Sequence, residues 1–262
     1  MSQTKKFEAT FIRRGITEAR EEEVLEEEAL QIAVNDKEFS MTMRTPGDDR
    51  FLIRGLLYSQ GLAPNGFLDY EEQELAFGTF VNVGLEEDVN SQRQLMATSS
   101  CGVCGEKNLD RLFDGLVKIN RQLSFDAKQI STFYSALSRR QKLFKKTGGS
   151  HCAAAFTLEG DLLCSFEDIG RHNAVDKVIG WLLENNRLKE ADALVVSSRI
   201  SYEIVQKCIL AGIPVLTGIS APSSLAVEMA QRFELTLAAF CRNDKATFYA
   251  GTQRVVEQLN LV

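Results

Sequence analysis

The chain has 262 residues, 44% of them hydrophobic and 25% charged, which suits one or two folded domains and excludes an intrinsically disordered protein. No apolar run approaches the roughly 20 residues of a membrane-spanning helix, and the N-terminus lacks a secretory signal, so we expect a cytoplasmic protein that contacts no membrane. The formal net charge of −6 argues against a general nucleic-acid binder, because phosphate affinity comes mainly from Lys and Arg.

The first half of the chain mixes predicted strands with predicted helices. Residues 18–28 are strongly acidic, and we expect a solvated segment that leads into a strand. Residues 35–38 resemble a turn between two strands. The predicted strands of this half are residues 30–34, 39–43, 75–83 and 94–98. One predicted helix opens near Pro46 and closes at Gly61, and another has helical spacing at Leu109, Leu112, Phe113 and Leu116.

A further helix is predicted after residue 125, and from residue 152 onward strands and helices alternate with short connections. Residues 126–146 predict an amphipathic helix that ends in the basic cluster 139–146. The predicted strands that follow are residues 152–158, 161–166, 193–197, 213–217 and 235–240, and the predicted helices are residues 171–184, 201–211 and 222–232. This alternation predicts βαβ units and a largely parallel sheet covered on both faces. We therefore expect an α/β fold with two parts, a smaller mixed α+β N-terminal subdomain at residues 1–122 and an α/β domain at residues 123–262.

Cys101 and Cys104 form a CxxC motif in a Gly-rich loop before a predicted helix. Structural zinc is one candidate chemistry, but it needs four ligands, and His151 and His172 are the only histidines. Thiol–disulfide redox is a second, although such motifs usually follow a strand near the start of a domain. Sulfur relay is a third, because a thiolate on a movable loop can accept a sulfur atom as a persulfide and pass it on. The other four cysteines stand singly in apolar surroundings and are expected to be buried.

Five ordered motifs resemble one known family, the formate dehydrogenase accessory sulfurtransferases, or FdhD family. The similar stretches are residues 99–106, 166–180, 196–216, 219–230 and 237–249. The resemblance implies that the chain takes sulfur from a cysteine desulfurase and passes it to the molybdenum cofactor in its bis(guanine dinucleotide) form. That cofactor is then inserted into formate dehydrogenase. The resemblance also implies a homodimer, and a larger domain similar to the cytidine deaminase fold.

The resemblance assigns the persulfide to Cys101 and an auxiliary thiol role to Cys104. It assigns cofactor binding to the stretch Phe240, Cys241, Arg242, Asn243, Asp244 and Lys245. This stretch also has a physical rationale, because ligands of open α/β sheets bind beyond the carboxyl ends of strands, and Arg242 and Lys245 suit a pyrophosphate. The family often has a Pro-Gly turn here, whereas this chain has RNDK.

No resident metal is expected, because the zinc deaminase pattern H-x-E is absent: His151 is followed by Cys152 and Ala153. Asp168, Arg171 and His172 open a predicted helix, and two interpretations stay open for them. In the first, the three residues contact the cofactor or the sulfur. In the second, Asp168 caps the helix, and Arg171 and His172 join a local hydrogen-bond network. Two alternative functions also stay open, a molybdenum-cofactor chaperone that handles no sulfur and a zinc-binding regulatory module.

Overall fold

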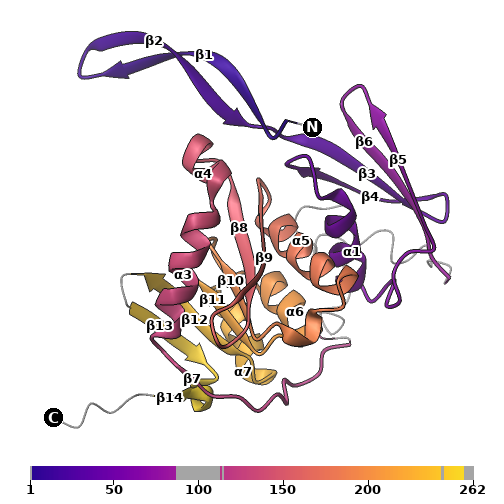
Figure 1. Ribbon diagram of the computed structural model, residues 1–262, viewed down its shortest axis with the longest axis vertical. Helices are drawn as coiled ribbons and strands as arrows, with labels where there is room; N and C mark the ends of the chain where they lie inside the picture. The colour runs from indigo at the N-terminus through magenta and orange to yellow at the C-terminus, as the bar shows by residue number, and fades with distance from the viewer. Residues whose placement is uncertain (1, 87–112, 114, 243–244, 257–262) are drawn as a thin grey trace.

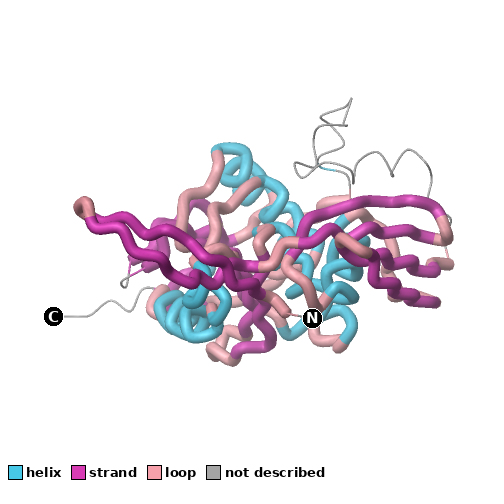
Figure 2. Tube along the Cα trace, turned by 90° about the horizontal axis from the view of Figure 1, so that it is seen from above, coloured by secondary structure: helices cyan, strands magenta, loops and turns pink. Residues whose placement is uncertain are grey.

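The computed structural model describes residues 2–86, 113, 115–242 and 245–256. These residues form a six-stranded sheet, a four-stranded sheet and a projecting two-stranded ribbon (Figure 1). Seen from above, the ribbon and the four-stranded sheet extend toward opposite sides of the molecule (Figure 2). A short parallel pair joins β7 (Phe125–Asp126) to β14 (Val255–Val256). Among the described residues, no helix is long and apolar enough to span a membrane.

The ribbon consists of β1 (Thr4–Arg13) and β2 (Ile16–Leu25), which pair antiparallel along their whole length. Arg14 and Gly15 connect them, both with positive φ (50° and 81°), as a tight two-residue hairpin loop requires. The acidic segment at residues 18–28 was expected to be a solvated lead-in. It is indeed solvated, but the prediction was wrong about its conformation, because most of it belongs to strand β2.

The four-stranded sheet has the order β4-β3-β6-β5, and helix α1 packs on its inner face. Its elements are β3 (Glu28–Val34), β4 (Lys37–Arg44), α1 (Asp49–Ser59), β5 (Asp69–Leu75) and β6 (Gly78–Gly84). The turn at residues 35–38, its flanking strands and the helix are confirmed. The single strand predicted at residues 75–83 is wrong, because the chain reverses between β5 and β6. The strand predicted at 94–98 lies outside the described residues, and so does most of the helix predicted around Leu109; residues 116–124 are irregular.

The six-stranded sheet has the order β13-β12-β11-β10-β8-β9. Its strands are β8 (His151–Phe156), β9 (Leu162–Asp168), β10 (Ala193–Val196), β11 (Val215–Gly218), β12 (Thr236–Arg242) and β13 (Lys245–Ala250). Only the pairs β10–β11 and β11–β12 are parallel, so the expected largely parallel sheet is wrong. The short β8–β9 hairpin reverses the chain, and β8 pairs antiparallel with β10. β13 adds a further antiparallel strand at the other edge.

Helices cover both faces of this sheet, as the sequence predicted. Alternate residues of β8 face opposite sides: Cys152, Ala154 and Phe156 pack with α3, whereas Ala153 and Ala155 pack with α5–α7. The helices are α3 (Gln129–Arg140), α4 (Lys142–Thr147), α5 (Arg171–Glu184), α6 (Tyr202–Leu210) and α7 (Ser224–Arg232), with short 3₁₀ turns η2 (Leu188–Glu190) and η3 (Thr252–Arg254). The one helix expected at residues 126–146 is two helices, because the backbone at Gln141 leaves the helical region (ψ 65°). The α/β fold is confirmed, and the domain limit at residue 123 stays a prediction.

Two glycines allow α1 to pack closely on α5. A Cβ atom at Gly55 would lie 2.0 Å from the carbonyl oxygen of Asp176, and one at Gly180 would lie 1.9 Å from that of Phe51. Each helix therefore presents a glycine to the backbone of the other. This contact joins the four-stranded sheet, through α1, to the larger α/β layer (Figure 1).

Replacing Gly55 by Ala tests this packing. We expect the free energy of unfolding to fall by about 1–3 kcal/mol, because the added methyl group meets backbone that cannot move aside cheaply. Helix propensity alone predicts the opposite sign, a gain of roughly 1 kcal/mol. Urea unfolding followed by circular dichroism measures the change, with the exposed Ser135→Ala of α3 as control. A stability equal to or above that of the wild type would contradict the close contact.

Candidate functional site

Five strands of the six-stranded sheet have a terminus at one edge of the sheet. Parallel strands β10, β11 and β12 end there, and the register places the start of β8 and the end of β9 beside them. Helices α5, α6 and α7 begin at the same edge, each directly after a strand. Ligands of open α/β sheets bind beyond the carboxyl ends of strands, and helix N-termini favour anions. We call this edge the carboxyl edge.

Basic side chains cluster at the carboxyl edge. The cation Arg171 and the imidazole of His172 stand in the first turn of α5, and the exposed Arg199 follows β10. Burial lowers the pKa of His151, and the positive charges of Arg171 and Arg199 lower it further. The buried Nε of Arg171 has no hydrogen-bond partner. The edge therefore offers positive charge and an unused donor, which suit a phosphate-bearing ligand.

His172 is tied to helix α6. Its Nε2 lies 2.7 Å from Oε2 of Glu203 and 3.1 Å from Oγ of Ser201. Burial by itself would raise the pKa of Glu203, but the hydrogen bond from His172 and nearby positive charges lower it below its ordinary value. Glu203 therefore stays ionised and orients the imidazole at the edge.

Asp168 forms a fully buried ion pair with Lys177, at 2.8 Å between Oδ2 and Nζ. Both groups also bind Thr45, which connects β4 to α1. The Thr45 N–H donates to Asp168 (3.2 Å), and Lys177 donates to the Thr45 carbonyl (3.1 Å). The other carboxylate oxygen of Asp168 accepts from the N–H of Gly170 (2.8 Å) and the amide of Asn173 (3.0 Å).

Asp168 fits neither of the two interpretations of the motif. Its carboxylate is buried and fully hydrogen-bonded, so it has a structural role. It does not cap the helix, because the N-cap of α5 is Gly170 and no side chain caps that end. Sequence reasoning missed Thr45 and Lys177. The one available signal was the spacing of Asn173 and Lys177, four residues apart on one helix face.

Part of the predicted site lies outside the described residues, namely Cys101, Cys104, Asn243 and Asp244. The rest of the predicted cofactor stretch lies at the carboxyl edge. Phe240 is exposed, with a positive φ of 54°, where the pairing of β12 with β13 shifts register. Arg242 and Lys245 are exposed and paired opposite each other. The structure thus brings these two cations to the same edge as Arg171 and Arg199.

The thiol of Cys241 points the other way, into the core beside Tyr134. Only the main chain of Cys241 is available to a ligand at the edge. Burial raises the pKa of Cys241 to about 11 and that of Cys164 to about 12. It also raises the pKa of Cys152 and Cys208. The prediction that the four single cysteines are buried is confirmed.

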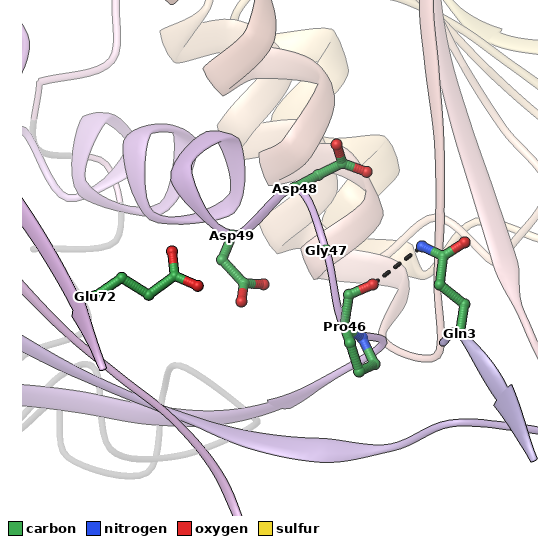
Figure 3. Close-up of a pocket in the computed structure, with 6 residues that line it drawn as sticks. All are labelled: Gln3, Pro46, Gly47, Asp48, Asp49 and Glu72. Carbon is green, nitrogen blue, oxygen red and sulfur yellow. Dashed lines mark hydrogen bonds between the residues drawn. The ribbon is translucent and has the colours of Figure 1, made fainter. Parts of the chain in front are cut away.

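A depression lies at the start of α1, lined by Gln3, Pro46, Gly47, Asp48, Asp49 and Glu72 (Figure 3). Gln3 donates to the carbonyl of Pro46 at 3.0 Å. Asp49 is already engaged, because both of its oxygens accept from the buried Arg44 at 2.9 and 2.8 Å. Burial raises the pKa of Asp48 above its usual range. Within the described part of the chain, no group of three His, Cys, Asp or Glu side chains could hold a metal ion, here or elsewhere.

The comparisons with known proteins agree with one another. The model of the FdhD/NarQ family matches residues 25–256. A sulfur carrier protein FdhD from Sulfolobus acidocaldarius is 39% identical over 97% of this chain and 99% of its own length. Proteins of the same name are 41% identical in Sulfurisphaera tokodaii and 38% identical in Mycobacterium tuberculosis, over at least 90% of this chain. The crystal structure of a formate dehydrogenase accessory protein from Desulfotalea psychrophila shares the fold (TM-score 0.78, 23% identity, covering 97% of this chain and 100% of that one).

Replacing Lys177 by Met tests the buried ion pair. We expect a loss of about 3–5 kcal/mol in the free energy of unfolding, because Asp168 would keep a buried charge without its partner. The double variant with Asp168→Leu should lose less than the sum of the two single variants. Urea unfolding gives all three values, and the exposed Lys189→Met serves as control. A cost below about 1 kcal/mol for Lys177→Met would show that the pair is not a determinant of stability.

Alkylation tests whether the buried thiols are inert. In a variant with Cys101 and Cys104 replaced by Ala, four of the six cysteines remain. We expect iodoacetamide at pH 8 to modify none of them in the native protein, because burial suppresses both access and thiolate formation. All four should react in denaturant, as intact mass would show. Rapid native modification of Cys241 would contradict its placement in the core.

Proposed function

The chain belongs to the FdhD/NarQ family, and we propose that it is a sulfur carrier required for formate dehydrogenase activity. One observation carries the proposal: proteins named sulfur carrier protein FdhD are 38–41% identical to this chain over at least 90% of both lengths. The CxxC motif supplies the thiol that such a carrier needs. A homodimer is part of the proposal, as the family resemblance implies.

Cys101 carries the sulfur in this proposal. Its thiolate attacks the outer sulfur of a persulfide on a cysteine desulfurase; a new S–S bond forms on Cys101, and the desulfurase cysteine leaves as a thiolate. An electron pair of the acceptor then attacks the outer sulfur; the S–S bond to Cys101 breaks, and Cys101 leaves as a thiolate. Cys104 assists as the auxiliary thiol. The four buried thiols do not compete, because a thiol must ionise and be reached before it can attack.

The acceptor is the bis(guanine dinucleotide) form of the molybdenum cofactor, bound as a client before its insertion into formate dehydrogenase. The carboxyl edge supports this assignment. Arg242 and Lys245 stand at the same edge of the sheet as Arg171 and Arg199, on elements that end or begin there. Guanidinium groups and helix N-termini both suit pyrophosphate oxygens. The exposed ring of Phe240 offers an apolar surface next to these cations.

The same edge also favours a second candidate, a cofactor chaperone that handles no sulfur. A chaperone needs the cations of the edge and has no use for a reactive thiol. The two candidates therefore predict different effects of replacing Cys101, but the same effect of replacing Arg242 and Lys245.

Intact-protein mass spectrometry after incubation with a cysteine desulfurase and cysteine tests the sulfur step. We expect the wild type to gain the mass of about one sulfur atom, removable by a thiol reductant, because a persulfide forms by thiol exchange. Cys101→Ala should show no gain and should fail to activate formate dehydrogenase. Cys104→Ala is the matched control in the same loop and should still load.

Two results would decide against this assignment. No gain in the wild type with a competent desulfurase would favour the chaperone, and full formate dehydrogenase activity with Cys101→Ala would remove Cys101 from the reaction. A double variant, Arg242→Gln with Lys245→Gln, separates binding from sulfur loading. It should load sulfur normally but retain less pterin cofactor, measured by fluorescence after oxidation.

A further inference from the structure

The basic cluster where α3 meets α4 contributes no residue to the carboxyl edge. Residues 127–158 contain no Asp or Glu, although the whole chain has more acidic than basic residues, 36 against 30. The cations of this stretch are Lys128, Arg139, Arg140, Lys142, Lys145 and Lys146. All except Lys128 lie between the last turn of α3 and the last turn of α4. Positive charge is therefore strongly segregated at this junction.

Most of these cations have no partner within the molecule. Lys146 pairs with Glu23 at 3.4 Å, at the base of the ribbon. Among the residues that the structure describes, four exposed cations of the junction form no ion pair, namely Arg139, Arg140, Lys142 and Lys145. The ring of Phe144 is 45% exposed between the two lysines in sequence. We use the name α4 patch for the set Arg139, Arg140, Lys142, Phe144 and Lys145.

The helix dipole accounts for only part of this charge. Cations are favourable in the last turn of a helix, where Lys145 stands, but Lys142 is the first residue of α4, where a cation is unfavourable. Glu167 accepts from the N–H groups of Leu143 and Phe144 at 2.8 and 2.9 Å. Both of its oxygens are thus used by the backbone, and it forms no ion pair with Lys142. The stability of the fold therefore does not explain the α4 patch.

The α4 patch adjoins the carboxyl edge. Glu167 belongs to the end of β9, so its hydrogen bonds hold the start of α4 at that edge. Only residues 148–150 separate the end of α4 from β8, which starts at the same edge (Figure 1). No Asp or Glu occurs in the loops of this edge at residues 169–170, 197–201 and 219–223. A surface rich in exposed cations therefore extends from the carboxyl edge onto α4.

We propose that the α4 patch is the docking surface for formate dehydrogenase, and that it binds an acidic protein surface around the opening of that enzyme's cofactor cavity. The inference rests on the proposed function, in which the client cofactor passes from the carboxyl edge into the enzyme. Direct transfer requires the opening to face this edge, so the enzyme contacts the surface next to it. The exposed cations there are complementary to carboxylates and repel a basic surface.

The composition of the α4 patch favours a protein partner over a nucleic acid. Arg and aromatic side chains are enriched in the cores of protein interfaces, and Arg139, Arg140 and Phe144 belong to these types. A nucleic-acid duplex needs a longer basic surface, because its affinity grows with the number of phosphates that the protein neutralises. On the side of the ribbon, the positive charge ends at Glu23. A compact acidic protein surface fits within this limit.

Charge reversal tests the docking surface. The probe is formate dehydrogenase purified without its cofactor, and interferometry measures its binding to the full chain at low and at physiological ionic strength. Lys142→Glu with Lys145→Glu should raise the dissociation constant at least about tenfold, because it sets like charges against each other. Binding of the wild type should weaken as salt is added, and binding of the variant should depend less on salt.

The matched control is Lys128→Glu with Lys189→Glu. It makes the same change of net charge at two exposed positions, one before α3 and one in η2 after α5. Both positions lie at the opposite edge of the six-stranded sheet, because α5 begins at the carboxyl edge and Gln129, next to Lys128, donates to the Leu158 carbonyl beyond the end of β8. This control should bind the enzyme like the wild type.

Three outcomes would overturn the docking surface: a wild type that does not bind the enzyme, a reversed patch that binds equally well, and a reversed patch that loses binding only to the desulfurase or to a DNA duplex. Sulfur loading and cofactor retention are measured on the same samples and should be unchanged in both variants. A wild type that neither loads sulfur nor retains cofactor would count against the proposed function. Normal loading with unaltered docking of the reversed patch would remove only the docking surface.

Zero-length cross-linking locates the contact independently. A carbodiimide joins a lysine to a carboxylate that lies in contact with it, and peptide mapping of the linked complex should identify Lys142 or Lys145 joined to an acidic residue of the enzyme. Lys142→Arg with Lys145→Arg keeps the charge, so it should keep the binding and lose these links. Links that occur mainly at Lys128 or Lys189 would overturn the proposal.

Discussion

The burial of Asp168 and Lys177 against each other constrains the rest of the molecule. An ion pair taken fully out of water is stable only when its remaining donors and acceptors are satisfied. Here the satisfying groups come from two places, Thr45 in the loop before α1, and the start of α5, where Gly170 and Asn173 donate. The pair therefore forms only when β4, β9 and α5 are all in place. It fixes the β4–α1 connection to the carboxyl edge, while Gly55 and Gly180 fix α1 along α5.

The same constraint positions Arg171 and His172, and it does so at a local cost. Cations are disfavoured at the positive end of a helix, yet Arg171 stands in the first turn of α5. His172 is held by Glu203, whereas the Nε of Arg171 stays buried without a hydrogen-bond partner. A phosphate at the carboxyl edge would supply a hydrogen-bond acceptor for Arg171, and it would also offset the repulsion between Arg171 and the helix dipole. Unfavourably placed charges and unsatisfied donors are typical of sites that bind ligands.

Helices α5, α6 and α7 were predicted to within two residues, because each has a helical apolar period and polar or glycine residues at its ends. Strand direction could not be predicted, since an apolar strand such as β10 looks the same beside parallel or antiparallel neighbours. The ribbon was missed for another reason. Both of its faces meet solvent along most of its length, so the glutamates of β2 carry no alternation of burial. The contact between Thr45 and Asp168 joins residues more than a hundred positions apart, and no local pattern reports it.

The described cysteines also bear on how a sulfur carrier would avoid misdirected exchange. A persulfide reacts with any accessible thiolate, so other cysteines in the same chain are potential acceptors. With a pKa raised to about 11, the Cys241 thiol is ionised in only about one molecule in ten thousand at pH 7. Cys152, Cys164 and Cys208 are also buried, with raised pKa values. Packing that stabilises the sheet thus also protects these four thiols from exchange.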